Sequence, residues 1–277
     1  MNIFNNRLIM IPVLFFSAFM GLATPMLAHE FWLEPIKYTA DAGGDVKVRI
    51  RNGQKFGGIE LAYFDNRVAM FDWIQNGQRA PIQARAGDAP AVNVENSGDG
   101  LVVLAYQSTP STLTYREWAL FEDFVTHKGF PKAVERHRTR GLPEVQFKEV
   151  YTRYCKTLIG VGTAAGQDAQ TGMEAEIVAL ANPYTEDLRQ GMPVQVFYQG
   201  APRSNAQIEV FERDQSGKVT VSIVQTDDAG RAIVPVEPGK EYLFDSVMLR
   251  EPVSDLALGN GAVWESLWAS LTFYVPE

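Results

Sequence analysis

The sequence contains three histidines, and the position of one of them favours metal chemistry. His29 follows Ala28 at the end of an apolar leader, so cleavage after Ala28 would make it the first residue. A histidine at a free N-terminus offers an α-amine and an imidazole, which titrate near pH 8 and near pH 6.5 and lose their protons when a metal competes. A second imidazole would complete a three-nitrogen site suited to Cu(II) or Ni(II).

His127 is the better second imidazole, because it lies in "FEDFVTHKGF" near two carboxylates and at a predicted helix end. His137 lies between Arg136 and Arg138, where positive charge opposes a cation, and we expect it to be solvated. No local motif such as HExxH links the histidines. Two alternatives need no metal: His127 interacts only with the carbonyls of its helix end, and His29 only begins a strand. The predicted metal ligands are His29, His127, Glu30 and Asp123, with Glu34 and Glu122 as further oxygen donors.

The first 28 residues have the pattern of a secretory signal peptide. Residues 1–7 carry one arginine, residues 8–23 are apolar without charge, and Pro25 precedes the small residue Ala28. Cleavage after Ala23 is the alternative and would leave His29 six residues from the end. The apolar run is short for a membrane span, and no segment of the mature chain resembles one. The sequence therefore predicts export to the periplasm.

Charge and cysteine content exclude some classes of protein. The chain has 25 basic and 33 acidic residues, a net charge of −8. An acidic exported protein is a poor nucleic-acid binder and a suitable handler of cations, although acidity also serves solubility. Cys155 is the one cysteine, so stability must come from packed cores, and its apolar neighbours predict a core position.

The pattern of apolar residues predicts a mainly β protein with two sandwiches. "VKVRIR" from Val46 alternates apolar and charged residues, and residues 29–114 are typical of an antiparallel sandwich. Residues 115–160 are predicted to be a helical insertion, which places 29–161 in one domain. The insertion is predicted from steps of three and four residues at Trp118, Phe121 and Val125, and again at Phe147, Val150, Tyr151, Tyr154, Cys155, Leu158 and Ile159.

A small-residue linker, residues 162–172, precedes a second β domain over 173–277. Its short strands recur about every ten residues, which is typical of immunoglobulin-like or transthyretin-like sandwiches.

Several segments resemble one family. "AHEFWLEP" after the leader is similar to the start of periplasmic domains of unknown function found beside nickel and cobalt uptake transporters. "EVYTRYCKTLIGVG", "EIVALANPY" and "TDDAGRAIV" resemble later parts of the same family, so the resemblance covers nearly the whole mature chain. It implies an immunoglobulin-like fold and an accessory role in divalent-metal uptake, with a membrane metal transporter as partner.

The predicted function is therefore to bind nickel or cobalt, with copper as the second choice, and to deliver it to a transporter. No reaction is predicted, because GxSxG, phosphate-loop and HExxH motifs are absent from the sequence. Two alternatives stay open. One is a glycan- or protein-binding module that stacks ligands on Trp73, Trp118 or Trp264. The other is a copper-dependent oxidative enzyme with an N-terminal histidine site.

Overall fold

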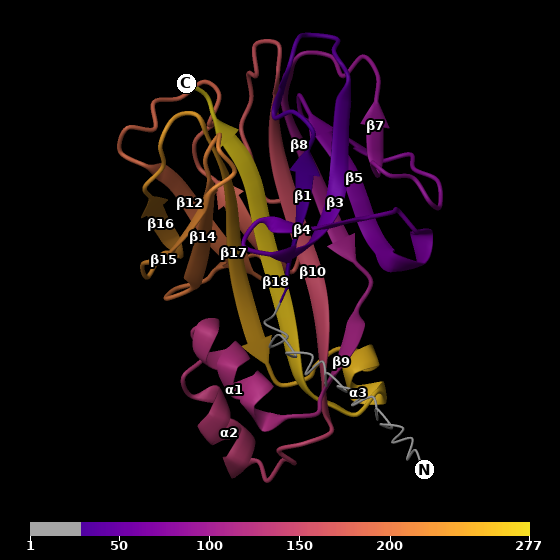
Figure 1. Cartoon of the computed structure of the whole chain (residues 1–277), viewed down its shortest axis with the longest axis vertical. Coiled ribbons are helices and arrows are strands. Elements are labelled where there is room, and N and C mark those ends of the chain that lie inside the picture. The colour runs from indigo at the N-terminus through magenta and orange to yellow at the C-terminus, as the bar shows by residue number, and fades with distance from the viewer. Residues whose placement is uncertain (1–28) are drawn as a thin grey trace, which may run out of the picture.

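The structure is a computed structural model, and it describes residues 29–277. The predicted signal peptide and both predicted cleavage sites lie outside the described residues. The described part is mainly β, with several sheets and short helices, as the sequence predicts (Figure 1). No helix within residues 29–277 is both long enough and apolar enough to cross a membrane.

A ten-stranded sheet forms the middle of the molecule, in the order β15-β14-β17-β18-β10-β8-β5-β6, with β2 and β9 also paired to β10. The long strands β10 and β18 run parallel and side by side, from Lys148 opposite Ala262 to Thr157 opposite Thr272 (Figure 1). The strands of this sheet are β2 (Thr39–Ala40), β5 (Val68–Gln75), β6 (Gln78–Pro81), β8 (Gly100–Ser108), β9 (Ser111–Tyr115), β10 (Phe147–Val161), β14 (Gln207–Arg213), β15 (Val219–Gln225), β17 (Lys240–Arg250) and β18 (Ala262–Val275).

Two four-stranded sheets cover opposite faces of this central sheet. Side chains of β10 alternate between two cores: Tyr154 and Leu158 pack with β11 and β12, whereas Cys155 and Ile159 pack with β3 and β7. Cys155 is buried, as predicted. One outer sheet contains β1 (Glu30–Pro35), β3 (Val46–Gln54), β4 (Gly57–Leu61) and β7 (Val92–Val94), and the other contains β11 (Ala175–Ala179), β12 (Met192–Tyr198), β13 (Ala201–Pro202) and β16 (Arg231–Val234).

The helices α1 (Trp118–His127) and α2 (Ala133–Thr139) lie together at one end of the long strands (Figure 1). They pack on β10, β17 and β18 through an aromatic cluster that includes Phe121 and Trp264. The remaining short helices are η1 (Asp65–Arg67) and α3 (Asp255–Gly259), whose first turn is capped by the Ser254 hydroxyl.

The prediction that His137 is solvated is wrong, because it is fully buried in this aromatic cluster. Its Nδ1 accepts a hydrogen bond from the Trp264 indole at 3.0 Å, and its Nε2 lies 2.9 Å from the carbonyl of Pro143. These two partners fix a neutral ring with the proton on Nε2. Burial lowers the pKa of His137 in agreement with that state. Trp264 is also fully buried, which leaves no exposed ring there for stacking on a ligand.

The helical insertion predicted over 115–160 is correct for α1 and α2 and wrong for its last part, because 147–161 is the long strand β10. Both faces of β10 are covered, so its sequence lacks the apolar–polar alternation of a half-buried strand. A continuous apolar run cannot be assigned by periodicity alone. The β-branched and aromatic residues of "FKEVYTRYCKTLIGV" are better suited to a pleated sheet.

The predicted linker, residues 162–172, has no regular secondary structure, but it does not divide the molecule into two separate sheets. Strands from both sides of it share the central sheet through β10 and β18. Ion pairs also anchor this segment to the central sheet. Nζ of Lys156, which is fully buried on β10, lies 2.6 Å from Oδ1 of Asp168 and 3.2 Å from Oε1 of Glu176. The two predicted sandwiches therefore share one sheet.

Candidate functional site

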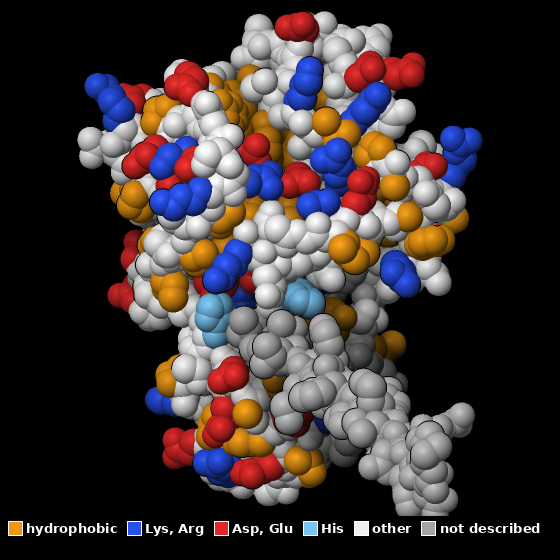
Figure 2. All heavy atoms as spheres, viewed as in Figure 1, with side chains coloured by type: hydrophobic (Ala, Val, Ile, Leu, Met, Phe, Trp, Pro, Cys, Tyr) orange, Lys and Arg blue, Asp and Glu red, His pale blue; other side chains and the backbone are white. Residues whose placement is uncertain are grey.

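The start of β1 and the end of α1 both lie at the waist between the sheets and the helices, where Figure 2 shows histidine side chains at the surface. Glu30, the first residue of β1, is only 4% exposed, and its Oε2 accepts a hydrogen bond from the amide of Lys55 at 2.9 Å. Burial and the negative charge of Asp245 raise the pKa of Glu30 to about 7. Glu30, the residue next to His29, therefore has a carboxyl group that ionises only at a higher pH than usual.

The last turn of α1 supplies the basic groups of this site. His127 is half-exposed, and its Nε2 lies 2.7 Å from Oε1 of Glu209 on β14. Lys128 is buried, and its Nζ contacts Oε2 of Glu209 at 2.5 Å and Oδ2 of Asp245 on β17 at 2.8 Å. Glu209 and Asp245 face one another because they are register partners in the central sheet. We call Glu30, His127, Lys128, Glu209 and Asp245 the waist cluster.

Electrostatic coupling ties the waist cluster together. Contact with the Glu209 carboxylate raises the pKa of His127, and the charge of Glu30 adds to that effect. Burial alone would lower the pKa of Lys128, but Asp245 and Glu209 outweigh it and raise that pKa. For Asp245, burial prevails over the attraction of Lys128, and its pKa is raised. The cluster therefore holds more acidic than basic groups in a largely buried setting.

One carboxylate oxygen of the waist cluster is incompletely satisfied. Oε1 of Glu209 is buried and accepts no hydrogen bond of standard geometry, although Nε2 of His127 lies 2.7 Å from it. Two ligand atoms at right angles, each about 2.1 Å from one metal ion, are about 3 Å apart. The 2.7 Å separation of His127 Nε2 and Glu209 Oε1 is close to that geometry. The pair can supply one nitrogen and one oxygen to a cation.

The four predicted metal ligands lie in different surroundings. His29 is exposed and directly precedes Glu30, and Glu30 and His127 share the waist cluster. Asp123 is exposed, one helical turn before His127, and has no ion-pair partner among the described residues. Within residues 29–277, no three His, Cys, Asp or Glu side chains are already gathered as metal ligands.

Lys128, Glu209 and Asp245 were not among the residues predicted from the sequence. The signal for the two acids is visible in hindsight: Glu209 and Asp245 each interrupt an apolar stretch of a strand, in "QIEVFER" and "YLFDSVML". An acid within such a stretch is rarely fully buried unless it is paired. The identity of its partner depends on the fold, because Lys128 lies 81 residues from Glu209.

Residues 26–249 match the family described as "Domain of unknown function (DUF4198)". The chain belongs to this family. No curated protein matches this DUF4198 chain. Two solved structures are distantly similar to it, at a TM-score of 0.21 each. The D0-D1 domain of intimin is 14% identical and covers 87% of this chain and 97% of its own. A tetra-tandem repeat from the extending region of a large adhesion protein is 10% identical, over 90% of this chain and 50% of its own.

Proposed function

We propose that this protein binds a divalent transition metal in the periplasm, nickel or cobalt first and copper second, and delivers it to a membrane transporter. The proposed ligands are the α-amine and imidazole of His29 and the imidazole of His127, with Glu209 as an added oxygen donor. The observation that carries the proposal is the position of β1: its first residue, Glu30, is electrostatically coupled to His127, so His29 begins beside the waist cluster.

The donor set suits borderline metals. Two imidazoles and an amine favour Cu(II) and Ni(II) over hard cations such as Mg²⁺ and Ca²⁺, which prefer oxygen. The half-exposed His127 is accessible from solvent, as an exchangeable cargo site requires. Lys128 limits the affinity, because its charge already neutralises part of Glu209 and Asp245. We therefore propose a capture site that also releases its metal, without a reaction.

The location and the partner rest on sequence. The leader supports export, and the resemblance of "AHEFWLEP" to periplasmic domains beside nickel and cobalt transporters supports the transporter as partner. Immunoglobulin-like remains our proposed description of each half, because a four-stranded outer sheet packs face to face on the shared central sheet in both.

Calorimetric titration of Ni(II) and Cu(II) into the mature chain starting at His29 tests the proposal. We expect about one metal ion per chain with micromolar or tighter affinity. A chain with one glycine before His29 keeps the imidazole and loses the terminal amine, and it should bind more than tenfold more weakly, about 1.4 kcal/mol. His29→Ala and His127→Ala should each have an effect at least as large. Thr126→Ala, an exposed change next to His127, is the matched control.

Several results would contradict this assignment. Equal affinity of the native and glycine-extended chains would remove the amine from the site, and unchanged binding by His127→Ala would remove the second imidazole. N-terminal mass spectrometry of the exported protein must also find His29 first. Cleavage after Ala23 in the cell would end the proposal in its present form.

A further inference from the structure

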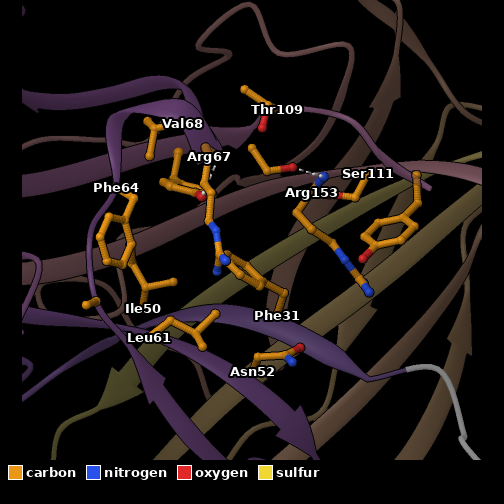
Figure 3. A pocket seen from close by; sticks show the side chains of 14 residues that line it. Phe31, Ile50, Asn52, Leu61, Phe64, Arg67, Val68, Thr109, Ser111 and Arg153 are labelled. Carbon is orange, nitrogen blue, oxygen red and sulfur yellow. Dashed lines mark hydrogen bonds between the residues drawn. The ribbon is translucent and has the colours of Figure 1, made fainter. Parts of the chain in front are cut away.

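A second site lies on the other side of β1, in a pocket of about 410 Å³ between the β1–β3–β4 sheet and the central sheet. Figure 3 shows Arg67 reaching into it between Phe64 and Phe31, while Arg153 enters from β10. The volume lies in the range of small-molecule sites, about 300 to 1,000 Å³. The pocket uses none of the proposed metal ligands.

Arg153 is the most unusual group in this pocket. Its Nη1 is buried and has no hydrogen-bond partner, and no carboxylate of the described chain forms an ion pair with it. The guanidinium lies over the rings of Trp268, at 4.0 Å, and Tyr151, at 5.1 Å. Burial lowers the pKa of Arg153, and Asp245 counteracts this only from a distance. An unpaired buried N–H of a cation is costly, so an acceptor from outside the chain would be favourable.

Arg67 brings a second positive charge to the same space. It is exposed, lies 5.8 Å from the Phe64 ring, and has no ion-pair partner within residues 29–277. None of the described residues that line the pocket is an aspartate or glutamate. By contrast, Arg51, Arg213 and Arg250 on nearby sheets each contact a carboxylate. The chain is acidic overall, so this is a local reversal of charge.

The remaining lining is apolar or neutral. Phe31 and Tyr106 stack with ring centroids 5.4 Å apart, and Leu61 and Val68 extend this apolar surface. Asn52, Thr109 and Ser111 add neutral polar groups at the rim. A bare inorganic ion would leave the aromatic wall unused, whereas a flat or aliphatic body would cover it.

We propose that this pocket binds a small organic carboxylate, with its carboxylate at Arg153 and Arg67 and its apolar body against Phe31 and Tyr106. Guanidinium groups bind carboxylates through two parallel hydrogen bonds, and the exposed guanidinium of Arg67, which has no ion-pair partner among residues 29–277, can supply them. The recognised class is a monocarboxylate attached to an aromatic ring or a short alkyl chain.

Titration of the mature chain with benzoate, 3-phenylpropionate and hexanoate tests the proposal, with benzamide as the uncharged match for benzoate and inorganic phosphate as the match for charge alone. We expect at least one carboxylate to bind with a Kd below about 1 mM, and benzamide and phosphate to bind at least tenfold more weakly. The indole N–H signal of Trp268 should shift with the bound carboxylate, because Arg153 covers that ring.

Arg67→Gln removes the charge without disturbing the core, since Arg67 is exposed. The substitution should weaken binding of the carboxylate at least tenfold. Arg231→Gln, an exposed arginine on β16, is the matched control and should leave the affinity unchanged. Arg153→Gln tests the buried guanidinium directly, provided that the variant folds. The proposal is overturned if no carboxylate binds, if phosphate or benzamide binds as well as benzoate, or if Arg67→Gln binds with the affinity of Arg231→Gln.

Discussion

Replacing Glu30 by glutamine should make the protein more stable at alkaline pH and change little at acid pH. The side chain is 4% exposed, and burial and Asp245 raise its pKa from 4.5 to about 7. A glutamine oxygen can still accept the hydrogen bond from the Lys55 amide. The substitution therefore removes the titration and keeps the shape and the contact.

The size of the effect follows from the two pKa values. A carboxyl whose pKa is raised by folding stabilises the folded state while it is protonated. That contribution is complete below about pH 4.5 and is lost as the pH rises to about 7. Each pKa unit corresponds to 1.36 kcal/mol, so the full loss is about 3 kcal/mol. The stability of Glu30→Gln relative to the natural chain should rise by about that amount between about pH 4.5 and about pH 8.

Urea unfolding of both chains at about pH 5 and about pH 8, in the presence of a chelator, measures this difference. Other groups titrate in both chains, so their contributions cancel in the comparison. Glu135→Gln, which removes an exposed carboxylate on α2, is the matched control and should give the same stability difference at both pH values. If the free energies of unfolding of Glu30→Gln and of the natural chain change with pH in parallel, within about 0.5 kcal/mol, the raised pKa of Glu30 is refuted.

Two further predictions concern buried polar groups away from the waist. Lys156→Met leaves Asp168 and Glu176 buried without their cation, and urea unfolding should show a loss of about 3 to 5 kcal/mol; a loss below about 1 kcal/mol would contradict the buried pairing. His137 should be a neutral Nε2–H imidazole at about pH 6.5, because Trp264 donates to its Nδ1 and burial lowers its pKa; nitrogen NMR of the ring would show an imidazolium if this is wrong.

The β character, many strand positions and the pair of short helices could be predicted from the sequence, because half-buried strands and amphipathic helices have visible periods. Strand β10 could not be predicted, because a strand with both faces buried lacks the alternation of apolar and polar residues. The parallel pairing of β10 with β18 joins residues more than 100 positions apart, and nothing local to either strand encodes it. The predicted boundary at 162–172 failed for the same reason, since that pairing places both halves in one sheet.

The residues of the candidate site, like the strands, could be predicted from the sequence only in part. The signal peptide pattern pointed to His29, and a helix end near carboxylates pointed to His127. The carboxylate that contacts His127 is Glu209, far along the chain, and not the neighbouring Asp123. Residue type and spacing suggested which groups have suitable chemistry. Strand register determined which of them meet, because it is the pairing of β14 with β17 that places Glu209 beside Asp245.

The register of β1 is what keeps the two proposed sites apart. Side chains alternate along a strand, so Glu30 and Trp32 face the waist cluster and the Phe56 core, whereas Phe31 and Leu33 face the pocket side. A slip of one residue would exchange these faces and bring Glu30 to the arginine pocket. Trp32, fully buried with its ring 5.7 Å from that of Phe56, opposes such a slip because the exchange would remove it from the core that it shares with Phe56. The two faces of β1 are therefore fixed by packing, and Glu30, the residue that follows His29, is held at the waist cluster.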